Sequence, residues 1–206
     1  MNIAAVIIAA GRSRRFGATD KRLALIDGEA LLCRVIRRVA TSAVSFIGVV
    51  TAPAPDESAD VLQILADLPV TQISNSQYAE GMGTSISAGI AALETSIDAA
   101  LIVPADMPEI SPELINLLIK AFEDRGGESV FVPVDAGGRQ RNPVLWPRKL
   151  FRELEGLDGA SGAKPLIKAH KDVVETLTWP DSAAFGDIDT REELQAYVTS
   201  RPDSKS

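Results

Sequence analysis

The chain has 206 residues, of which 46% are apolar and 24% charged, values typical of one globular domain. They exclude wholesale disorder, collagen and coiled coil. The net charge of −7, from 21 basic and 28 acidic residues, argues against a general nucleic-acid binder. The single cysteine and single histidine exclude an internal disulfide and multi-cysteine or multi-histidine metal sites. A chain with no internal disulfide fits a cytoplasmic location. No segment reaches the ~20 apolar residues of a membrane helix, so we expect no membrane association.

Apolar runs alternate with helical patterns along the whole chain. Residues 3–9 form a continuous apolar run, typical of a strand covered on both faces. The later strands are predicted at residues 44–50, 70–74, 99–103, 129–133, 143–146 and 173–178. The predicted helices span residues 31–41, 56–66, 84–94, 112–123, 150–154, 164–169 and 191–198. Ser111 and Thr190 are expected to cap the helices that follow them.

This alternation of strands and helices implies a largely parallel sheet with helices on both faces. Loops that follow parallel strands meet along one edge of such a sheet, where ligands bind in open α/β folds. We therefore expect the loops after Ala9, Ser74 and Val103 to form the site. No change in composition divides the chain, so residues 1–199 are predicted to form a single domain and 200–206 a disordered polar tail.

The first of these loops carries an unusual concentration of cations. Residues 9–17 read AAGRSRRFG and precede Lys21 and Arg22. The spacing fits neither the P-loop nor the dinucleotide fingerprint. A glycine-permitted turn that exposes backbone N–H groups beside several cations suits a polyphosphate. The alternative is a solvated basic loop.

Two carboxylates stand where predicted elements end or begin. Asp106 follows the apolar strand 99–103, a position from which a carboxylate could hold a metal; the alternative is a surface residue before a turn at Pro108. Asp189 directly precedes Thr190, and helix capping is the alternative role there.

The string AAGRSRRFG followed by Lys21 resembles the signature of nucleotidyltransferases with a glycosyltransferase-A-like Rossmann fold. It is most similar to the MobA-like family, especially its molybdenum cofactor cytidylyltransferases. The resemblance extends over residues 3–194. It implies an α/β, three-layer Rossmann-like fold with a mostly parallel mixed sheet. Asp20 stands where the family pattern has proline, and we expect this change to loosen the loop before Lys21.

The resemblance also implies roles for individual residues. The family carries (Gly/Ala)-Asp-x-Pro and Asp-x-(Asp/Asn)-Thr-x-Glu motifs, which place Asp106 and Asp189 on a shared Mg²⁺. Arg15, Lys21 and Asp106 would be catalytic, with the two cations neutralising charge as pyrophosphate leaves. Lys21 is expected to be unburied, because its loop has no apolar periodicity. The implied nucleotide-binding residues are Ala9, Ala10, Gly11, Arg12, Ser13, Lys21, Asn75, Gly81, Met82 and Ser85.

Later segments are similar to the part of the family that faces the second substrate. Arg141, Asn142 and Lys164 would bind this acceptor, a phosphorylated pterin. The implied reaction is Mg²⁺-dependent transfer of a nucleotidyl group from a nucleoside triphosphate to molybdopterin, with release of pyrophosphate. A molybdoenzyme or its chaperone would be the implied protein partner.

The nucleotide is suggested by Ala10. The cytidylyl branch of the family tends to carry Ala-Ala-Gly here and the guanylyl branch Ala-Gly-Gly, so CTP is favoured. The alternatives are a molybdopterin guanylyltransferase, a sugar-phosphate nucleotidyltransferase and a non-catalytic nucleotide-binding chaperone.

Overall fold

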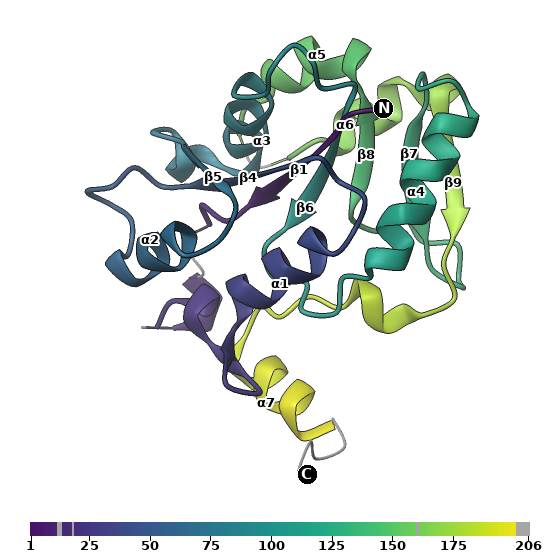
Figure 1. Ribbon diagram of the computed structural model, residues 1–206. Helices are drawn as coiled ribbons and strands as arrows, with labels where there is room; N and C mark the ends of the chain where they lie inside the picture. The colour runs from purple at the N-terminus through teal and green to yellow at the C-terminus, as the bar shows by residue number, and fades with distance from the viewer. Residues whose placement is uncertain (12–13, 18, 160, 201–206) are drawn as a thin grey trace.

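The computed structural model describes residues 1–11, 14–17, 19–159 and 161–200 (Figure 1). A seven-stranded sheet in the order β5-β4-β1-β6-β8-β7-β9 forms its centre, and a two-stranded hairpin, β2–β3, lies apart from it. The strands are β1 Ile3–Ile8, β2 Leu25–Ile26, β3 Glu29–Ala30, β4 Phe46–Thr51, β5 Thr71–Ser74, β6 Ala99–Pro104, β7 Val130–Val134, β8 Val144–Pro147 and β9 Val174–Thr178.

Only β8 runs against the other strands of the large sheet. It pairs antiparallel with both β6 and β7, whereas β1 pairs parallel with β4 and β6, β4 with β5, and β7 with β9. The predicted mostly parallel mixed sheet is therefore confirmed.

Helices cover both faces of the sheet, which makes three layers (Figure 1). The alternating side chains of β1 explain why this strand is apolar throughout. Ile3, Ala5 and Ile7 pack into the core beneath α1, α2 and α4, whereas Ala4 and Val6 pack into the core beneath α3 and α5. The helices are α1 Leu31–Ala40, α2 Ala59–Ala66, α3 Met82–Ala91, α4 Pro112–Asp124, α5 Phe151–Glu155, α6 Lys164–Ala169 and α7 Arg191–Ser200.

Local capping chemistry sets several helix boundaries. Ser111 Oγ accepts a hydrogen bond from Leu114 N at 3.1 Å and begins α4, as predicted. Helix α3 begins two residues before its predicted start, because Gly81, with φ of 139°, lets the chain turn directly into Met82. The β2–β3 hairpin was not predicted, since its strands have only two residues each.

Helix α2 begins at Ala59, three residues after its predicted start. Residues 52–58 are instead used in a turn around the Glu57 side chain, which accepts hydrogen bonds from Ala52 N at 3.1 Å and Ser58 N at 2.8 Å. A carboxylate bonded to the backbone on both sides competes with helix formation, so the prediction was wrong at this end.

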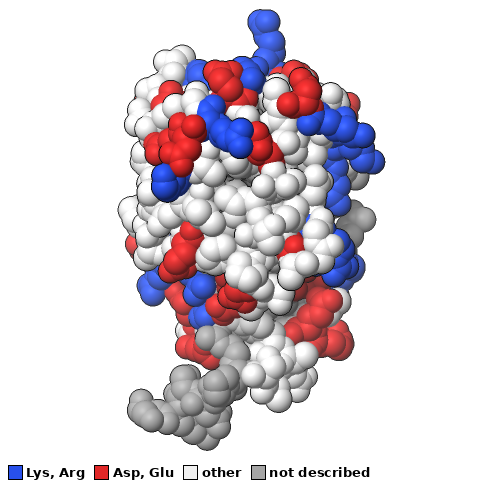
Figure 2. All heavy atoms as spheres, turned by 90° about the vertical axis from the view of Figure 1, so that its right-hand side faces the viewer, with Lys and Arg blue, Asp and Glu red and all other residues white. Residues whose placement is uncertain are grey.

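The face seen in Figure 2 carries acidic and basic side chains in mixture, with an uncharged area near its centre. None of the helices formed by the described residues combines the length and apolarity needed to cross a bilayer. Of the predicted tail, Ser200 ends α7, and 201–206 lie outside the described residues. The single-domain interpretation of residues 1–199 stays a prediction.

Candidate active site

A cavity of about 1060 Å³ opens where β1 and β6 end. The loops after β1, β5 and β6 contribute to its walls, which is the position predicted from the strand order. Most of the predicted site residues line it. They are Ala9, Ala10, Gly11, Arg15, Lys21, Gly81, Met82, Ser85, Asp106, Asn142, Lys164 and Asp189.

A cluster of opposite charges lies in the cavity wall. Lys21 Nζ is 2.9 Å from Asp106 Oδ2 and 3.2 Å from Asp189 Oδ1, and Arg15 Nη2 is 2.9 Å from Asp189 Oδ2. The Lys21 side chain is 11% exposed, so the expectation that it is unburied was wrong. Two carboxylates compensate the cost of withdrawing its ammonium from water.

Asp106 and Asp189 converge on one cation, the Lys21 ammonium, although they lie 83 positions apart in the sequence. This arrangement fits a hard divalent metal, because carboxylate oxygens are the ligands that Mg²⁺ takes in small numbers. The described residues contain no group of three or more acidic, histidine or cysteine side chains suited to a metal. A metal held here would therefore complete its coordination with water and phosphate oxygens.

Thr190 and Glu193, which follow Asp189, cap helix α7. Thr190 Oγ1 accepts from Glu193 N at 3.2 Å, while Glu193 Oε2 accepts from Asp189 N at 2.7 Å and from Thr190 N at 2.9 Å. This is a capping box, and its hydrogen bonds lower the pKa of Glu193. The Asp189 backbone is thereby fixed while its carboxylate faces Lys21 and Arg15.

The first turn of α7 also contacts the segment that carries the cations. Arg191 Nε donates to Phe16 O at 3.1 Å and Arg191 Nη2 donates to Thr19 Oγ1 at 2.9 Å. Residues more than 170 positions apart are joined by these bonds. The loop and the last helix therefore form one wall of the site.

Asp20 does not loosen the chain before Lys21, contrary to the prediction. Its carboxylate accepts from Arg22 N at 2.9 Å, which caps the 3₁₀ helix Lys21–Leu23, and from the Arg22 guanidinium. Sequence reasoning missed Arg22 and its second partner, Glu57, as structural parts of the site.

Asn75 lies outside the cavity lining and is 4% exposed. Its Nδ2 donates to Thr84 Oγ1 and Ser85 Oγ, both at 3.1 Å, and its Oδ1 accepts from Gln77 N at 2.9 Å. These bonds hold the loop after β5 against the start of α3. The structure therefore places the Asn75 amide in support of the cavity wall, and its role in nucleotide binding stays a prediction.

Arg141 is also absent from the lining, and Arg12 and Ser13 lie outside the described residues. The Arg141 guanidinium bonds Asp135 Oδ2 at 2.8 Å. Hydrogen bonds from the backbone N–H of Arg139 and from the Arg141 side chain lower the pKa of Asp135 to about 2. Arg141 thus fixes the turn before Asn142, which does reach the cavity.

Two lysines from α6 line the cavity: Lys164, which was predicted, and Lys168, which was missed. Their spacing of four residues places them on one face of the helix, a pattern visible in the sequence. The segment before α6 is attached to α3, because Gly83 N donates to Gly159 O at 2.9 Å.

Gly83→Ala is expected to separate this segment from α3. A Cβ at position 83 would lie 2.3 Å from the carbonyl oxygen of Asp158, which is backbone and cannot turn aside. We expect a loss of about 1–3 kcal/mol in unfolding free energy and faster hydrogen exchange at residue 83. Gly156→Ala is the control, since its nearest new contact is an ordinary 3.5 Å. Equal melting temperatures for both variants would contradict the prediction.

The cavity joins a cationic loop, a pair of convergent carboxylates and further lysines at the carboxyl ends of parallel strands. That combination is typical of α/β enzymes that act on phosphorylated nucleotides. Residues 5–173 match the MobA-like NTP transferase domain family. The chain belongs to this family, whose reaction is nucleotidyl transfer.

A curated relative and two solved structures are similar to this chain over nearly its whole length. A molybdenum cofactor guanylyltransferase of Shewanella putrefaciens is 26% identical and aligns over 96% of this chain and 97% of its own length. The crystal structure of Rv0371c from Mycobacterium tuberculosis superposes with a TM-score of 0.80 at 22% identity, covering 97% of this chain and 99% of that one. A manganese complex of Rv0371c gives a TM-score of 0.78 at 19% identity, covering 98% and 100% of the two chains.

Proposed function

We propose that this nucleotidyltransferase transfers CMP from CTP to molybdopterin and releases pyrophosphate. One observation carries the proposal: a single cavity is lined by the cationic loop with its paired carboxylates and by Lys164 and Lys168. No ion pair occupies either α6 lysine within the described part of the chain. Their ammonium groups are suited to the phosphate of an acceptor. The names of the relatives point to the molybdenum cofactor as the class of acceptor.

In the proposed reaction an oxygen of the acceptor phosphate forms a bond to the α-phosphorus, and the bond from that phosphorus to pyrophosphate breaks. Arg15 and Lys21 stabilise the negative charge that develops on the leaving group. Asp106 and Asp189 would hold Mg²⁺, which when bound neutralises charge and orients the triphosphate. The chain contributes positioning and charge, and no protein nucleophile is required.

The names of the relatives give no support for CTP, since they are guanylyltransferases. The proposed preference for CTP therefore depends on Ala10. Ala10 is buried and lines the cavity just after β1. Its methyl group narrows the space beside the base, which favours a pyrimidine over a purine. The Asn75 amide donates to Thr84 and Ser85. We therefore assign the discrimination between CTP and GTP to the Ala10 methyl group, at about 1–3 kcal/mol.

The experiment compares kcat/KM for CTP and GTP in the wild type and in Ala10→Gly, with molybdopterin as acceptor. We expect the wild type to prefer CTP and Ala10→Gly to shift the ratio about tenfold towards GTP. Ala163→Gly, a change of the same kind at another cavity residue, should leave the ratio unchanged. A tenfold wild-type preference for GTP would assign the protein to the guanylyl branch.

Two other functions would be distinguished by which acceptor, if any, leads to release of pyrophosphate. A sugar-phosphate nucleotidyltransferase would use sugar 1-phosphates in place of molybdopterin, and a nucleotide-binding chaperone would release pyrophosphate with neither. The paired Asp106 and Asp189 favour an active enzyme over a chaperone. Delivery of the product to a molybdoenzyme or its chaperone, use of Mg²⁺ in preference to other divalent metals, and a cytoplasmic location belong to the same proposal.

A further inference from the structure

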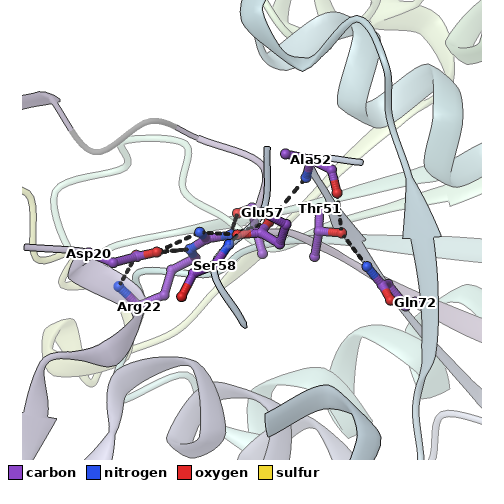
Figure 3. Close-up of polar contacts among 8 residues, drawn as sticks. Asp20, Arg22, Thr51, Ala52, Glu57, Ser58 and Gln72 are labelled. Atoms are coloured by element: carbon purple, nitrogen blue, oxygen red, sulfur yellow. Dashed lines mark hydrogen bonds and ion pairs between the residues drawn. The ribbon is translucent and has the colours of Figure 1, made fainter. Parts of the chain in front are cut away.

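A buried ion cluster lies beside the cavity and is not explained by substrate binding. It consists of Arg22, Asp20 and Glu57 (Figure 3). The Glu57 side chain is only 1% exposed and the Arg22 residue 9%. Charges buried to this degree require nearly complete pairing, so the arrangement of their hydrogen bonds is informative.

Every N–H of the Arg22 guanidinium has an acceptor within the protein. Nε donates to Asp20 Oδ1 at 2.9 Å. Nη1 donates to Ala9 O and to Glu57 Oε2, both at 2.8 Å, and Nη2 donates to one carboxylate oxygen each of Asp20 and Glu57. Arg22 belongs to the basic stretch of the first loop and lines the cavity, yet it has no donor left for a phosphate.

Glu57 connects this guanidinium to the sheet. Its two carboxylate oxygens also accept from Ala52 N and Ser58 N, and Ala52 directly follows β4. In Figure 3 the contacts continue through Thr51, whose Oγ1 accepts from Gln72 Nε2 of β5 at 2.9 Å. The cluster is therefore attached to the end of β4 and, through the Gln72 side chain, to β5.

Two of the three residues bonded to Arg22 flank the loop that follows β1. Ala9 lies at one end of segment 10–19 and Asp20 at the other, immediately before Lys21. A single guanidinium, anchored by Glu57, thus fastens both ends of the segment that carries the cations. Fixing such a segment before the substrate arrives removes part of the ordering cost of binding.

We propose that Arg22, Asp20 and Glu57 form a clamp that sets the geometry of the nucleotide-binding segment and of Lys21. These are positioning residues, which act through the loop and do not touch the substrate. The inference rests on nucleotidyl transfer as the reaction, and it is independent of which nucleotide and which acceptor are used.

The contacts within the clamp favour the charged forms of Asp20 and Arg22. Burial disfavours the charged forms of Asp20 and Arg22, but their mutual hydrogen bonds and the charge of Glu57 on Arg22 outweigh it. The pKa of Asp20 lies below its ordinary value and the pKa of Arg22 above its own. Asp20 and Arg22 are therefore both charged at neutral pH.

Glu57→Gln tests the clamp with little change in volume. The amide replaces one carboxylate oxygen by a donor, so two of the four hydrogen bonds that Glu57 accepts are lost. Affinity for CTP and for GTP is measured calorimetrically with Mg²⁺ and without acceptor. We expect the Kd for whichever nucleotide the wild type binds to rise about tenfold, a change of about 1.4 kcal/mol.

Asp135→Asn is the matched control, because Asp135 also accepts from two backbone N–H groups and an arginine. The arginine bonded to Asp135, Arg141, lies outside the cavity lining, whereas Arg22 lines the cavity. Both variants should lower the melting temperature, and only Glu57→Gln should weaken nucleotide binding by the folded protein. A Kd for Glu57→Gln equal to that of the wild type overturns the clamp. An incorrect nucleotide or acceptor assignment would leave this comparison intact, since both nucleotides are tested and no acceptor is present.

A second pair of variants separates geometry from charge. Asp20 has φ of −70°, the value that a proline ring imposes. Asp20→Ala should raise the nucleotide Kd as Glu57→Gln does, whereas Asp20→Pro should restore part of the affinity by fixing the backbone. Equal weakening in both variants would show that loop geometry is not what the clamp supplies.

Discussion

Asp106→Ala is expected to reduce kcat about a thousandfold while the protein remains folded. The carboxylate contributes to the reaction as one of two candidate metal ligands, and its bonded partner in the structure is Lys21. The backbone of Asp106 keeps its own role, since its carbonyl accepts from Ile188 N at 3.0 Å whatever the side chain is. The side chain is partly exposed, so its removal opens no core cavity. The rate of pyrophosphate release with Mg²⁺ measures kcat, and a thermal melt shows whether the variant is folded.

Asp187→Ala is the control for this experiment. Asp187 is exposed, lies two residues before Asp189 and is absent from the cavity lining. It should retain wild-type turnover. A wild-type rate for Asp106→Ala in saturating Mg²⁺ would contradict the assignment of a metal to this pair of carboxylates.

Lys21→Ala is expected to lower kcat by about 10²- to 10³-fold, with a much smaller effect on stability. The loss in rate follows from removing a preorganised cation beside the reacting phosphates. The stability effect is limited because Arg15 still faces Asp189 and both carboxylates retain contact with water. We expect an unfolding free energy within about 1 kcal/mol of the wild type, a shift of about 2–4 °C in Tm.

Lys120→Ala provides the comparison for Lys21→Ala. Lys120 also pairs with an aspartate, Asp124 at 2.8 Å, but on the exposed surface of α4. Its removal should change neither kcat nor Tm. If Lys21→Ala unfolded readily and its folded fraction kept the wild-type kcat, the lysine would have a structural role only.

The features predicted correctly from the sequence depend on neighbours in the chain. The apolar run of β1, the Ser111 cap and the Thr190 cap are each encoded within a few residues. The position of the cavity was predicted from the alternation of strands and helices, because loops that follow parallel strands meet at one edge of the sheet. These signals need no knowledge of distant residues.

The features that were missed depend on pairs far apart in sequence. Arg22 and Glu57 are 35 residues apart, and neither position has a local pattern that identifies its partner. The Lys21 side chain is largely withdrawn from solvent because carboxylates 85 and 168 residues later neutralise it, although its own loop is polar. Helix α2 begins late because the Glu57 carboxylate, which pairs with Arg22, also accepts from the nearby backbone N–H groups of Ala52 and Ser58. Charge pairing across the fold overrode local propensity at each of these positions.

The attachment of Asp189 and Arg191 to the first loop separates the residues that build the sheet from those that complete the site. All seven strands of the large sheet lie between Ile3 and Thr178, whereas Asp189 and Arg191 follow the last strand. A chain that ended after Thr178 would contain every strand, the cationic loop and Asp106, but it would lack the second carboxylate and the arginine that donates to Phe16 O. Residues beyond the sheet are therefore needed for the complete charge cluster of the site.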